Sequence, residues 1–399
     1  MKRRIFLQGL GAGSALCLGN AWGLSDGKTQ PATVRPLVPV IGTHDQFAVF
    51  KVIGIGGGGR NAINHMVEST IEGVDFICFD TDKQALKGAR AKTLLQLGLG
   101  TTKGLGAGAN PEVGRQAALE DRESIAAALA GADMIFIIVG MGGGTGTGTA
   151  PVVAEVAKEL GILTVAVVTM PCPFEGSRRR HIAKDGIAEL ITHVGSLITI
   201  PNNKRFADHG NDLTLRGAFK DVNGILWNAT RSIVEINCQD LIGVDFGDVT
   251  TVLSGMGVAM VGTGTAVGPE RAREAAKAAV YCPLFESIDL AAAKGMLITI
   301  TAGRSMTMNE FDEVGNTVRD FMDDDALVVM GVRLDLEMKD ELRVTIVATG
   351  LDDRLISAVG RDAIEREKAI RWNLEALSTT DNSLSDYQDI PAFLRRPTD

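Results

Sequence analysis

The sequence predicts an α/β fold in which a doubly wound parallel sheet is followed by a long central helix and a second, smaller α/β domain. Short apolar runs alternate with segments of helical spacing, the pattern of parallel strands joined by helices. Glycine-rich loops directly follow some of these runs. The chain has 399 residues, of which 45% are hydrophobic, and this length allows two separate hydrophobic cores.

The first half of the chain supplies the predicted parallel sheet. The apolar run Met134–Val139 is typical of a buried parallel strand, and Ala150–Leu160 has helical spacing with Pro151 in its first turn. Another helix is expected over Pro111–Leu129. Further strands are expected at 48–53, 76–79, 163–168 and 197–200, and a helix through His65 and Val67 follows the first of them.

The second half begins with one long predicted helix, from about Leu213 to Glu235, where apolar residues recur at helical spacing. The glycine-rich segment 253–268 leads into a region with expected strands at 296–301, 326–332 and 342–349, and a helix over 309–322 that Asn309 can cap. The predicted divisions are an N-terminal extension (1–46), a ligand-binding domain (47–212), the central helix (213–236), a C-terminal domain (237–350), a linker (351–385) and a tail (386–399).

Charge and composition exclude several classes of function. A formal net charge of -9 argues against general nucleic-acid binding, and the run Arg178–Arg180 is local. The five cysteines and five histidines show neither a CxxC pair nor metal-ligand spacing, so we expect no metal held by protein ligands alone. Cysteines used in this way are typical of a reducing compartment.

The loop Gly140–Gly148 is the most informative segment of the chain. Its glycines and threonines lie between a predicted strand and a predicted helix, where backbone N–H groups and the helix N-terminus can surround an anion. It lacks the Lys-Ser/Thr ending of a P-loop. The loop therefore predicts a phosphate-binding site of another kind.

A second glycine loop leaves two interpretations open. Gly54–Gly59 satisfies GxGxxG between a strand and a helix, and Asp80 ends the next strand where a ribose-binding carboxylate is expected, which favours a nicotinamide-dependent Rossmann enzyme. A third loop, Gly104–Gly108, is predicted to lie at the same sheet edge. Three such loops suit a nucleoside triphosphate better than a dinucleotide, which needs only one phosphate turn.

Four motifs, in order along the chain, resemble the tubulin/FtsZ family of GTPases. GMGGGTGTG (140–148) resembles the signature of the family, while KGLGAGANPEVGR (103–115), VDFGDV (244–249) and the tail DYQDIPAFLRR (386–396) are similar to its bacterial FtsZ members. The resemblance runs from about Lys51 to Gly350 and resumes at the tail. It implies a GTPase domain joined to a smaller domain by a long helix.

The same resemblance implies a cytoskeletal protein that polymerises with GTP into the cell-division ring. A second possibility is a member of the family that binds GTP but hydrolyses it weakly, and that co-assembles with or regulates an ordinary copy. Nucleotide preference separates both of these from a nicotinamide-dependent enzyme.

By resemblance, GTP or GDP is bound by backbone groups of the two main glycine loops and by side chains from later segments. Glu175 and Asn202 are implied to contact the ribose and Arg179 the nucleotide. Phe219 is implied to stack on guanine while Asn223, four residues on and on the same helix face, hydrogen-bonds its edge. The implied nucleotide-binding residues are Gly57, Gly58, Gly59, Arg60, Asn61, Gly144, Thr145, Gly146, Glu175, Arg179, Asn202, Phe219 and Asn223.

Asp245 and Asp248 are the catalytic residues that the resemblance implies. In the family their loop inserts into the nucleotide site of the next subunit, where a carboxylate can orient the water that attacks the γ-phosphate. Such a head-to-tail contact generates open filaments, so the first expected partner is a second copy of the chain. Mg²⁺ is expected to be held mainly through the nucleotide phosphates.

Three positions depart from the family pattern. Gly243 stands where an asparagine is usual, which is expected to slow hydrolysis. Asp80 also replaces an asparagine, and it places an extra negative charge near the nucleotide. Arg60 stands where a small residue is usual, and its side chain either points into solvent or adds a charge near the phosphates.

The tail resembles the peptide by which the family binds membrane-anchored division proteins such as FtsA and ZipA. Its implied apolar anchors are Ile390, Pro391, Phe393 and Leu394. Contact with the membrane is therefore expected to be indirect only.

The N-terminal extension conflicts with that location. Residues 2–8 and the small apolar run that follows resemble a twin-arginine export signal. Because GTP and the implied partners occur in the cytoplasm, we expect a cytoplasmic protein at the division site.

Overall fold

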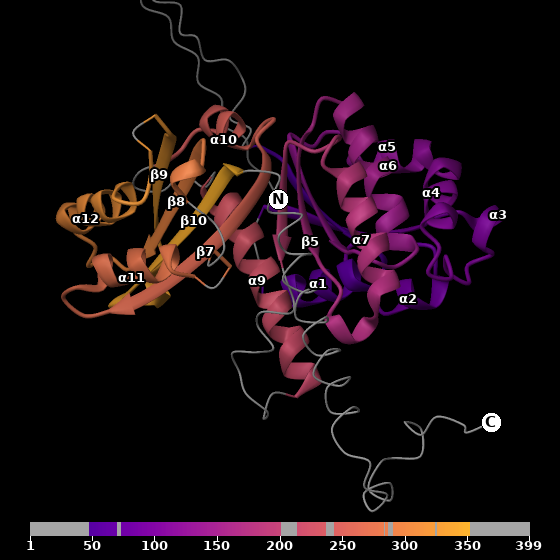
Figure 1. Ribbon diagram of the computed structural model, residues 1–399, viewed down its shortest axis with the longest axis horizontal. Coiled ribbons are helices and arrows are strands. Elements are labelled where there is room, and N and C mark those ends of the chain that lie inside the picture. Colours follow the sequence, from indigo (N-terminus) through magenta and orange to yellow (C-terminus); the bar gives the residue numbers. More distant parts are fainter. Residues whose placement is uncertain are drawn as a thin grey trace, which may run out of the picture. The chain divides into compact units, whose positions relative to one another are not determined.

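The computed structural model describes residues 48–69, 73–200, 214–236, 243–282, 284–285, 290–323 and 325–351 (Figure 1). The predicted extension, linker and tail therefore lie outside the described residues, apart from Leu351 at the start of the linker. The strands are β1 (Phe50–Ile55), β2 (Val74–Asp80), β3 (Thr93–Gln96), β4 (Met134–Gly140), β5 (Leu163–Thr169), β6 (Ser196–Ile200), β7 (Gly257–Val267), β8 (Gly295–Ala302), β9 (Leu327–Leu334) and β10 (Glu341–Leu351).

Helices alternate with these strands through most of the described chain. They are α1 (Gly56–Glu68), α2 (Lys83–Lys87), α3 (Leu99–Thr102), α4 (Pro111–Glu120), α5 (Arg122–Leu129), α6 (Thr145–Glu159), α7 (Ser177–Leu190), α9 (Leu215–Ile236), α10 (Phe246–Leu253), α11 (Arg271–Val280) and α12 (Met308–Arg319).

The ten strands form one sheet, in the order β3-β2-β1-β4-β5-β6-β7-β10-β8-β9. From β3 to β7 every pairing is parallel, β10 is antiparallel to both of its neighbours, and β8 and β9 are parallel. The chain adds β2 and β3 on one side of β1 and then adds β4, β5 and β6 on the other side. Open α/β sheets bind ligands at such a switch point, which here lies between β1 and β4. The predicted doubly wound sheet is confirmed.

The second region extends the first sheet instead of forming a separate one. The start of β7 pairs with β6 in register from Ser196↔Gly257 to Ile198↔Ala259, and β10, β8 and β9 continue from β7. The repeated glycines in 253–268 hide this strand from a periodicity analysis because they supply no side chains to alternate. One hydrophobic cluster accordingly runs from β1 to β10.

The two faces of the parallel half are covered by different helices (Figure 1). Along β1, Val52 belongs to the core shared with α1 and α9, while Ile53 belongs to the core shared with α4, α5, α6 and α7. Because successive residues of a strand point to opposite faces, a strand buried on both sides is continuously apolar. This accounts for the unbroken apolar run in β4.

Two helix predictions need correction. The helix expected over Pro111–Leu129 is broken at Asp121, whose carboxylate accepts a hydrogen bond from the Gly98 N–H (2.6 Å). Asn309 does not cap α12, because the cap is Thr307, two residues earlier, which forms a reciprocal capping box with Glu310.

Candidate functional site

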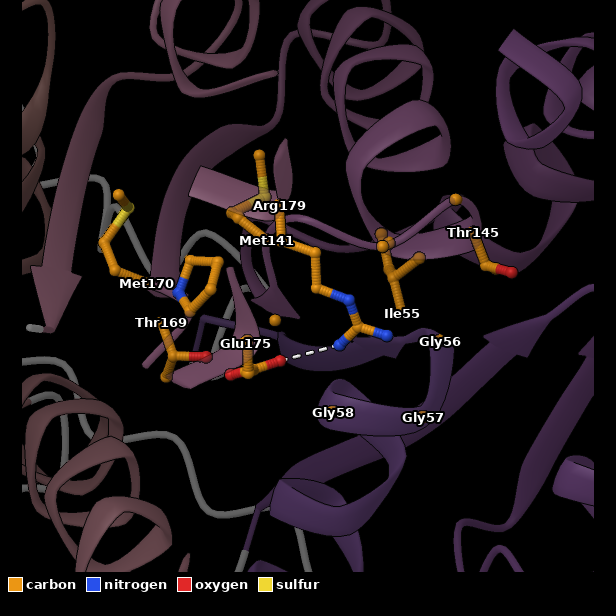
Figure 2. A pocket seen from close by; sticks show the side chains of 15 residues that line it. Ile55, Gly56, Gly57, Gly58, Met141, Thr145, Thr169, Met170, Glu175 and Arg179 are labelled. Atoms are coloured by element: carbon orange, nitrogen blue, oxygen red, sulfur yellow. Dashed lines mark hydrogen bonds and ion pairs between the residues drawn. The ribbon is translucent and has the colours of Figure 1, made fainter. Parts of the chain in front are cut away.

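A pocket with a cavity volume of about 370 Å³ lies at the carboxyl ends of β1, β4 and β5, at the switch point of the sheet (Figure 2). The register Ile55↔Phe79 and Ile55↔Val139 brings the ends of β1, β2 and β4 to the same edge. The pocket is lined by Ile55, Gly56, Gly57, Gly58, Gly140, Met141, Gly143, Gly144, Thr145, Gly146, Thr169, Met170, Pro171, Glu175 and Arg179.

The first wall of the pocket is the junction between β1 and α1. The helix begins at Gly56 immediately after the strand, and its first turn carries no acidic residue. Gly56 has a φ of +69°, which an L side chain rarely adopts, and a Cβ on Gly58 would lie 3.2 Å from the Gly140 backbone. Backbone N–H groups at such a helix start have no partner within the helix, so they can bind an anion.

The second wall is the loop that leads from β4 into α6. The helix begins at Thr145, earlier than the predicted Ala150, and again has no acidic residue in its first turn. The Gly142 N–H donates to Thr147 Oγ1 (2.9 Å), and the hydroxyls of Thr81 and Thr145 are 2.6 Å apart, which ties the end of β2 to this helix. Two helix N-termini therefore meet at one pocket, and both favour negative charge there.

The third glycine loop is not among the residues that line the pocket. Gly104–Gly108 follows the short helix α3, and the segment around it packs behind Gly144: a Cβ on Gly144 would lie 2.8 Å from the Asn110 nitrogen and 2.9 Å from the Ala107 Cβ. Two of the three predicted loops line the pocket. The third lies beside the end of β2, where Leu105 bridges to Asp82, and supports the Gly144 loop from behind.

Glu175 and Arg179 supply charged groups to the rim of the pocket. They form an ion pair of 2.6 Å (Figure 2). Glu175 also accepts a hydrogen bond from the Cys172 N–H (2.9 Å), which holds its carboxylate at the rim. The pair places one hydrogen-bond acceptor and one cation beside the phosphate-binding walls.

The other predicted binding residues are placed as follows. Gly59 is buried against β4, since a Cβ there would lie 2.4 Å from the Ile138 carbonyl oxygen. The Arg60 guanidinium donates to the Ala85 carbonyl (2.9 Å) and to Asn61 Oδ1 (2.9 Å), so it is neither free in solvent nor at the pocket. Asn223 is half-buried on α9. Asn202 and the side chain of Phe219 lie outside the described residues.

Thr169, Met170 and Pro171 line the pocket without having been predicted. Thr169 ends β5, and the residues that follow such a strand meet the switch-point edge. The order of the strands in the sheet would have identified them, but that order is not contained in the residue pattern of a single segment.

Asp245 and Asp248 lie at the amino-terminal ends of the parallel strands, whereas the pocket lies at their carboxyl ends; these are the two opposite edges of the sheet. Asp245 caps α10 by accepting a hydrogen bond from the Asp248 N–H (2.8 Å), and both side chains are exposed. Phe246, next to Asp245, packs edge-on against Phe50 at the start of β1 (ring centroids 6.2 Å apart). The pocket begins at the other end of β1, and a six-residue strand is about 20 Å long. Neither aspartate can reach the pocket of its own subunit.

Asp80 ends β2 with a side chain that is almost fully buried (3% exposed) and does not line the pocket. Burial raises the pKa of this carboxyl, and the N–H groups of Asp82 and Thr81 offset the effect in part. A carboxyl with a raised pKa in the folded state destabilises that state once the pH exceeds the pKa of the unfolded chain, because its ionised form is then the costly one to bury.

We therefore expect Asp80→Asn to raise the thermal unfolding midpoint at neutral pH. The free energy of unfolding should increase by on the order of 1 kcal/mol, which is the lower end of the cost of burying a polar group with incomplete hydrogen-bond partners. The increase should shrink as the pH falls toward about 4, where the carboxyl is protonated in the unfolded chain as well. Melting curves of both proteins across this range test it, and a lower midpoint for the asparagine variant at neutral pH would contradict it.

Within the described residues, no group of three or more His, Cys, Asp or Glu side chains is placed to hold a metal ion. The same part of the chain contains no helix that is both long and apolar enough to cross a membrane.

Comparisons with known proteins agree with this arrangement. The sequence profile described as "Tubulin/FtsZ family, GTPase domain" matches residues 49–208, and that of "FtsZ family, C-terminal domain" matches residues 257–352. The Cell division protein FtsZ of Azotobacter vinelandii is 51% identical over 385 residues, covering 89% of this chain and 98% of the relative. That of Coxiella burnetii is 49% identical over 376 residues, covering 89% and 97%.

Solved structures give the same result. An empty FtsZ dimer of M. jannaschii superposes with a TM-score of 0.73 at 40% identity, covering 77% of this chain and 90% of that one. The two sequence profiles together match the parallel half of the sheet and its antiparallel extension.

Proposed function

Because the chain belongs to the tubulin/FtsZ family of GTPases, and within it to the FtsZ cell-division proteins, we propose that its glycine pocket binds the phosphates of GTP and that a second subunit completes the hydrolytic site. As a member of this family, the chain is a self-assembling protein of the cell-division cytoskeleton that hydrolyses GTP. Neither a nicotinamide-dependent enzyme nor a weakly hydrolysing regulatory paralogue is favoured by these relatives. The observation that carries the proposal is that the pocket and the two aspartates lie at opposite edges of one sheet.

Backbone groups at the starts of α1 and α6 bind the triphosphate in this account. Gly57 and Gly58 supply one wall, and Gly144, Thr145 and Gly146 supply the wall at the γ-phosphate. The two helix N-termini add partial positive charge without a lysine. Gly59, Arg60 and Asn61 then act on the phosphates only indirectly, through the shape of the first turn of α1.

The nucleoside is placed by the rim and by α9. Glu175 accepts a hydrogen bond from a ribose hydroxyl, and its existing bond with the Cys172 N–H orients the carboxylate for this contact. Arg179 gives up part of its ion pair with Glu175 and contacts the nucleotide instead. We retain Asn202 as a ribose contact and Phe219 and Asn223 as the contacts of guanine, because the resemblance to the family implies these roles.

Mg²⁺ enters this site with the nucleotide. Its ligands are expected to be mainly phosphate oxygens and water, as is usual for Mg²⁺ at a nucleotide. When bound, the ion neutralises charge on the β- and γ-phosphates.

Hydrolysis requires the carboxylates of a neighbouring subunit. A subunit stacked with its α10 edge on the pocket edge of the next would bring Asp245 and Asp248 to the γ-phosphate, where a carboxylate can orient and polarise the attacking water. The contact joins two different surfaces, so it repeats into an open filament. Loss of the γ-phosphate removes charge-mediated contacts from the junction and weakens it.

The location and the further partners follow from the family. We propose a cytoplasmic protein that forms the division ring and binds membrane-anchored division proteins such as FtsA and ZipA through Ile390, Pro391, Phe393 and Leu394. These four residues lie outside the described residues. The export-signal interpretation of the N-terminal extension receives no support from the relatives.

GTP turnover and pelleting, measured in the same samples over a range of protein concentrations, test the proposal. A site shared between subunits predicts no turnover below a threshold concentration, and turnover that rises above it in proportion to the pelleted protein. Turnover per subunit that is independent of concentration would contradict the shared site. A failure to bind GTP would contradict the nucleotide assignment itself.

We expect Gly243→Asn to increase the turnover of assembled protein. Gly243 is exposed, and a Cβ there meets no atom within 4 Å, so the asparagine fits without rearrangement. One added hydrogen bond in the transition state, about 1.4 kcal/mol, corresponds to roughly a tenfold faster reaction. The assay is turnover per pelleted subunit, and an unchanged value would show that this glycine does not limit hydrolysis.

A further inference from the structure

The carboxyl ends of α11 and α12 carry an aromatic pair, one ring exposed and the other half-buried, that the proposed GTPase cycle does not use. Tyr281 is 70% exposed, and its ring lies edge-on against Phe321 with ring centroids 5.5 Å apart. Met322 beside it is half-buried, and three exposed aspartates follow from the end of α12. We call this group the α11–α12 patch; it consists of Tyr281, Phe321, Met322, Asp320, Asp323 and Asp325.

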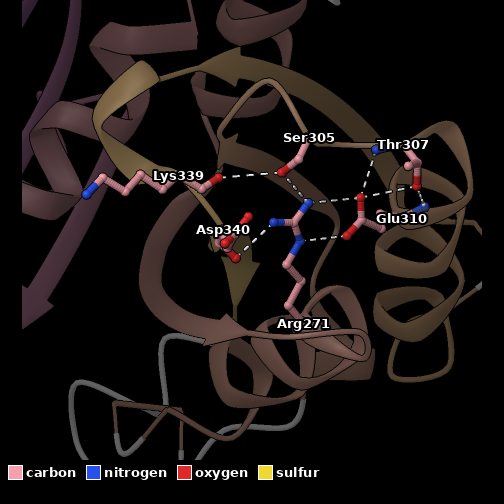
Figure 3. A network of polar contacts seen from close by, with 6 residues as sticks. All are labelled: Arg271, Ser305, Thr307, Glu310, Lys339 and Asp340. Atoms are coloured by element: carbon pink, nitrogen blue, oxygen red, sulfur yellow. Dashed lines mark hydrogen bonds and ion pairs between the residues drawn. The ribbon is translucent and has the colours of Figure 1, made fainter.

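A buried polar network at the opposite ends of the two helices holds the patch together (Figure 3). Arg271, the first residue of α11, is paired with Glu310 in the first turn of α12 (2.6 Å), and it also donates to the Asp340 carbonyl (2.8 Å). Glu310 belongs in turn to the capping box with Thr307. The two helices thus begin side by side and run in the same direction, so they also end side by side.

The patch is acidic for two independent reasons. The segment Arg319–Asp325 contains four aspartates and one arginine, a formal charge of 1 − 4 = −3. Two helix C-termini also end there, and each carries partial negative charge on its unpaired carbonyl groups. An aromatic surface in such a field favours an apolar segment that carries cations.

The described part of the chain ends at the same side of the sheet. Thr349 of β10 pairs with Gly295 of β8, which pairs with Leu327 of β9, directly after the patch. Leu351, where the described residues stop, is two residues beyond Thr349. Two strand spacings amount to about 10 Å, so the remaining chain starts close to the patch.

We propose that the tail of the same chain docks on the α11–α12 patch through Phe393, Leu394, Arg395 and Arg396. This segment has apolar side chains followed by two cations, the chemistry that the patch is suited to bind. Between Leu351 and Ile390 there are 390 − 351 − 1 = 38 residues, more than enough to cover the distance. A tether of this kind keeps the segment at an effective concentration on the order of millimolar, so even weak docking is well populated. A docked tail is unavailable to division proteins until they compete it away.

Nuclear magnetic resonance of the full chain, isotope-labelled and kept unassembled with GDP, tests this docking through the amide signals of Ile390 and of 392–396. In the parent protein these signals should be broadened and shifted by contact with the folded body. Replacing both Asp323→Lys and Asp325→Lys should reduce the docked population roughly tenfold. Tyr281→Ser should act in the same direction, and its melting curve checks that the domain remains folded. Asp312→Lys, at an exposed aspartate nearer the start of α12, is the matched control and should change nothing.

A charge exchange makes the test specific. Arg395→Asp and Arg396→Asp, added to the two lysine variants in one chain, should restore the broadened signals. Sharp tail signals that are identical in the parent and in every variant would overturn the proposal. Broadening that disappears on dilution would also overturn it, because the occupant would then be the tail of a second copy.

Discussion

Asp245→Asn and Asp248→Asn are each expected to abolish most GTP turnover while leaving GTP binding intact. A positioned carboxylate that activates water contributes roughly 100-fold or more to the rate, and the amide cannot replace it. Binding should be unaffected because both residues lie at the sheet edge opposite the pocket. Turnover of assembled protein, together with nucleotide affinity measured at equilibrium, provides the test.

The choice of asparagine separates catalysis from folding. Asp245 caps α10 through the Asp248 N–H, and asparagine caps a helix as well as aspartate does. Asp245→Ala should cost about 1 kcal/mol of stability in addition to the lost turnover, because it removes the cap. Full turnover in both asparagine variants would show that these carboxylates are not the catalytic groups.

Gly57→Val is expected to weaken nucleotide binding strongly in a protein that remains folded. Gly57 is exposed in the pocket, its φ is not in the left-handed region, and a Cβ there meets no protein atom within 4 Å. The added side chain therefore occupies space that only the phosphates would use. Loss of two charge-assisted hydrogen bonds of about 1.5 kcal/mol each corresponds to roughly 100-fold weaker binding.

Thermal unfolding with and without GDP measures both halves of this expectation. Without nucleotide, the midpoint of the valine variant should match that of the parent. With nucleotide, the upward shift seen in the parent should be lost, since a ligand stabilises only the state that it binds. An equal shift in both proteins would place the phosphates elsewhere.

Much of the parallel half could be predicted from residue patterns, because its strands are buried on both faces and read as apolar runs. Met134–Val139 and Leu163–Val168 were each found to within a residue. Their helices were less sharply bounded: the glycines at the start of α6 have poor helix propensity, yet the first turn forms because it packs against α1 and α4.

The second half was harder to predict for reasons of geometry. The strand β7 contains glycines where α11 approaches closely, and a Cβ on Gly264 would lie 2.2 Å from the Ala275 carbonyl oxygen. Such glycines are needed for packing but look like loop residues in a sequence. The short strand β3, half-exposed at the sheet edge, also gave no signal.

The candidate site also has a part that the sequence predicts and a part that it does not. Backbone phosphate cradles have a sequence signature, so Gly57, Gly144 and Thr145 were predicted and lie in the pocket. Placement of a long side chain depends on its neighbours, and Arg60 is held by the Ala85 carbonyl of α2, which no local pattern specifies. The loop of Asp245 is expected from the sequence to lie away from the phosphate edge of its own subunit, and the strand order and chain direction give the physical reason.

Mixing two inactive proteins tests the central claim that the site is shared between subunits. The Asp245→Asn protein has an intact pocket and lacks a catalytic carboxylate; the Gly57→Val protein has the carboxylates and lacks a working pocket. A site completed in trans predicts that each is nearly inactive alone and that the mixture hydrolyses GTP, at junctions where the first supplies the pocket and the second supplies Asp245. A mixture that stays as inactive as its components, while both proteins remain folded and the first still binds GTP, would contradict the account.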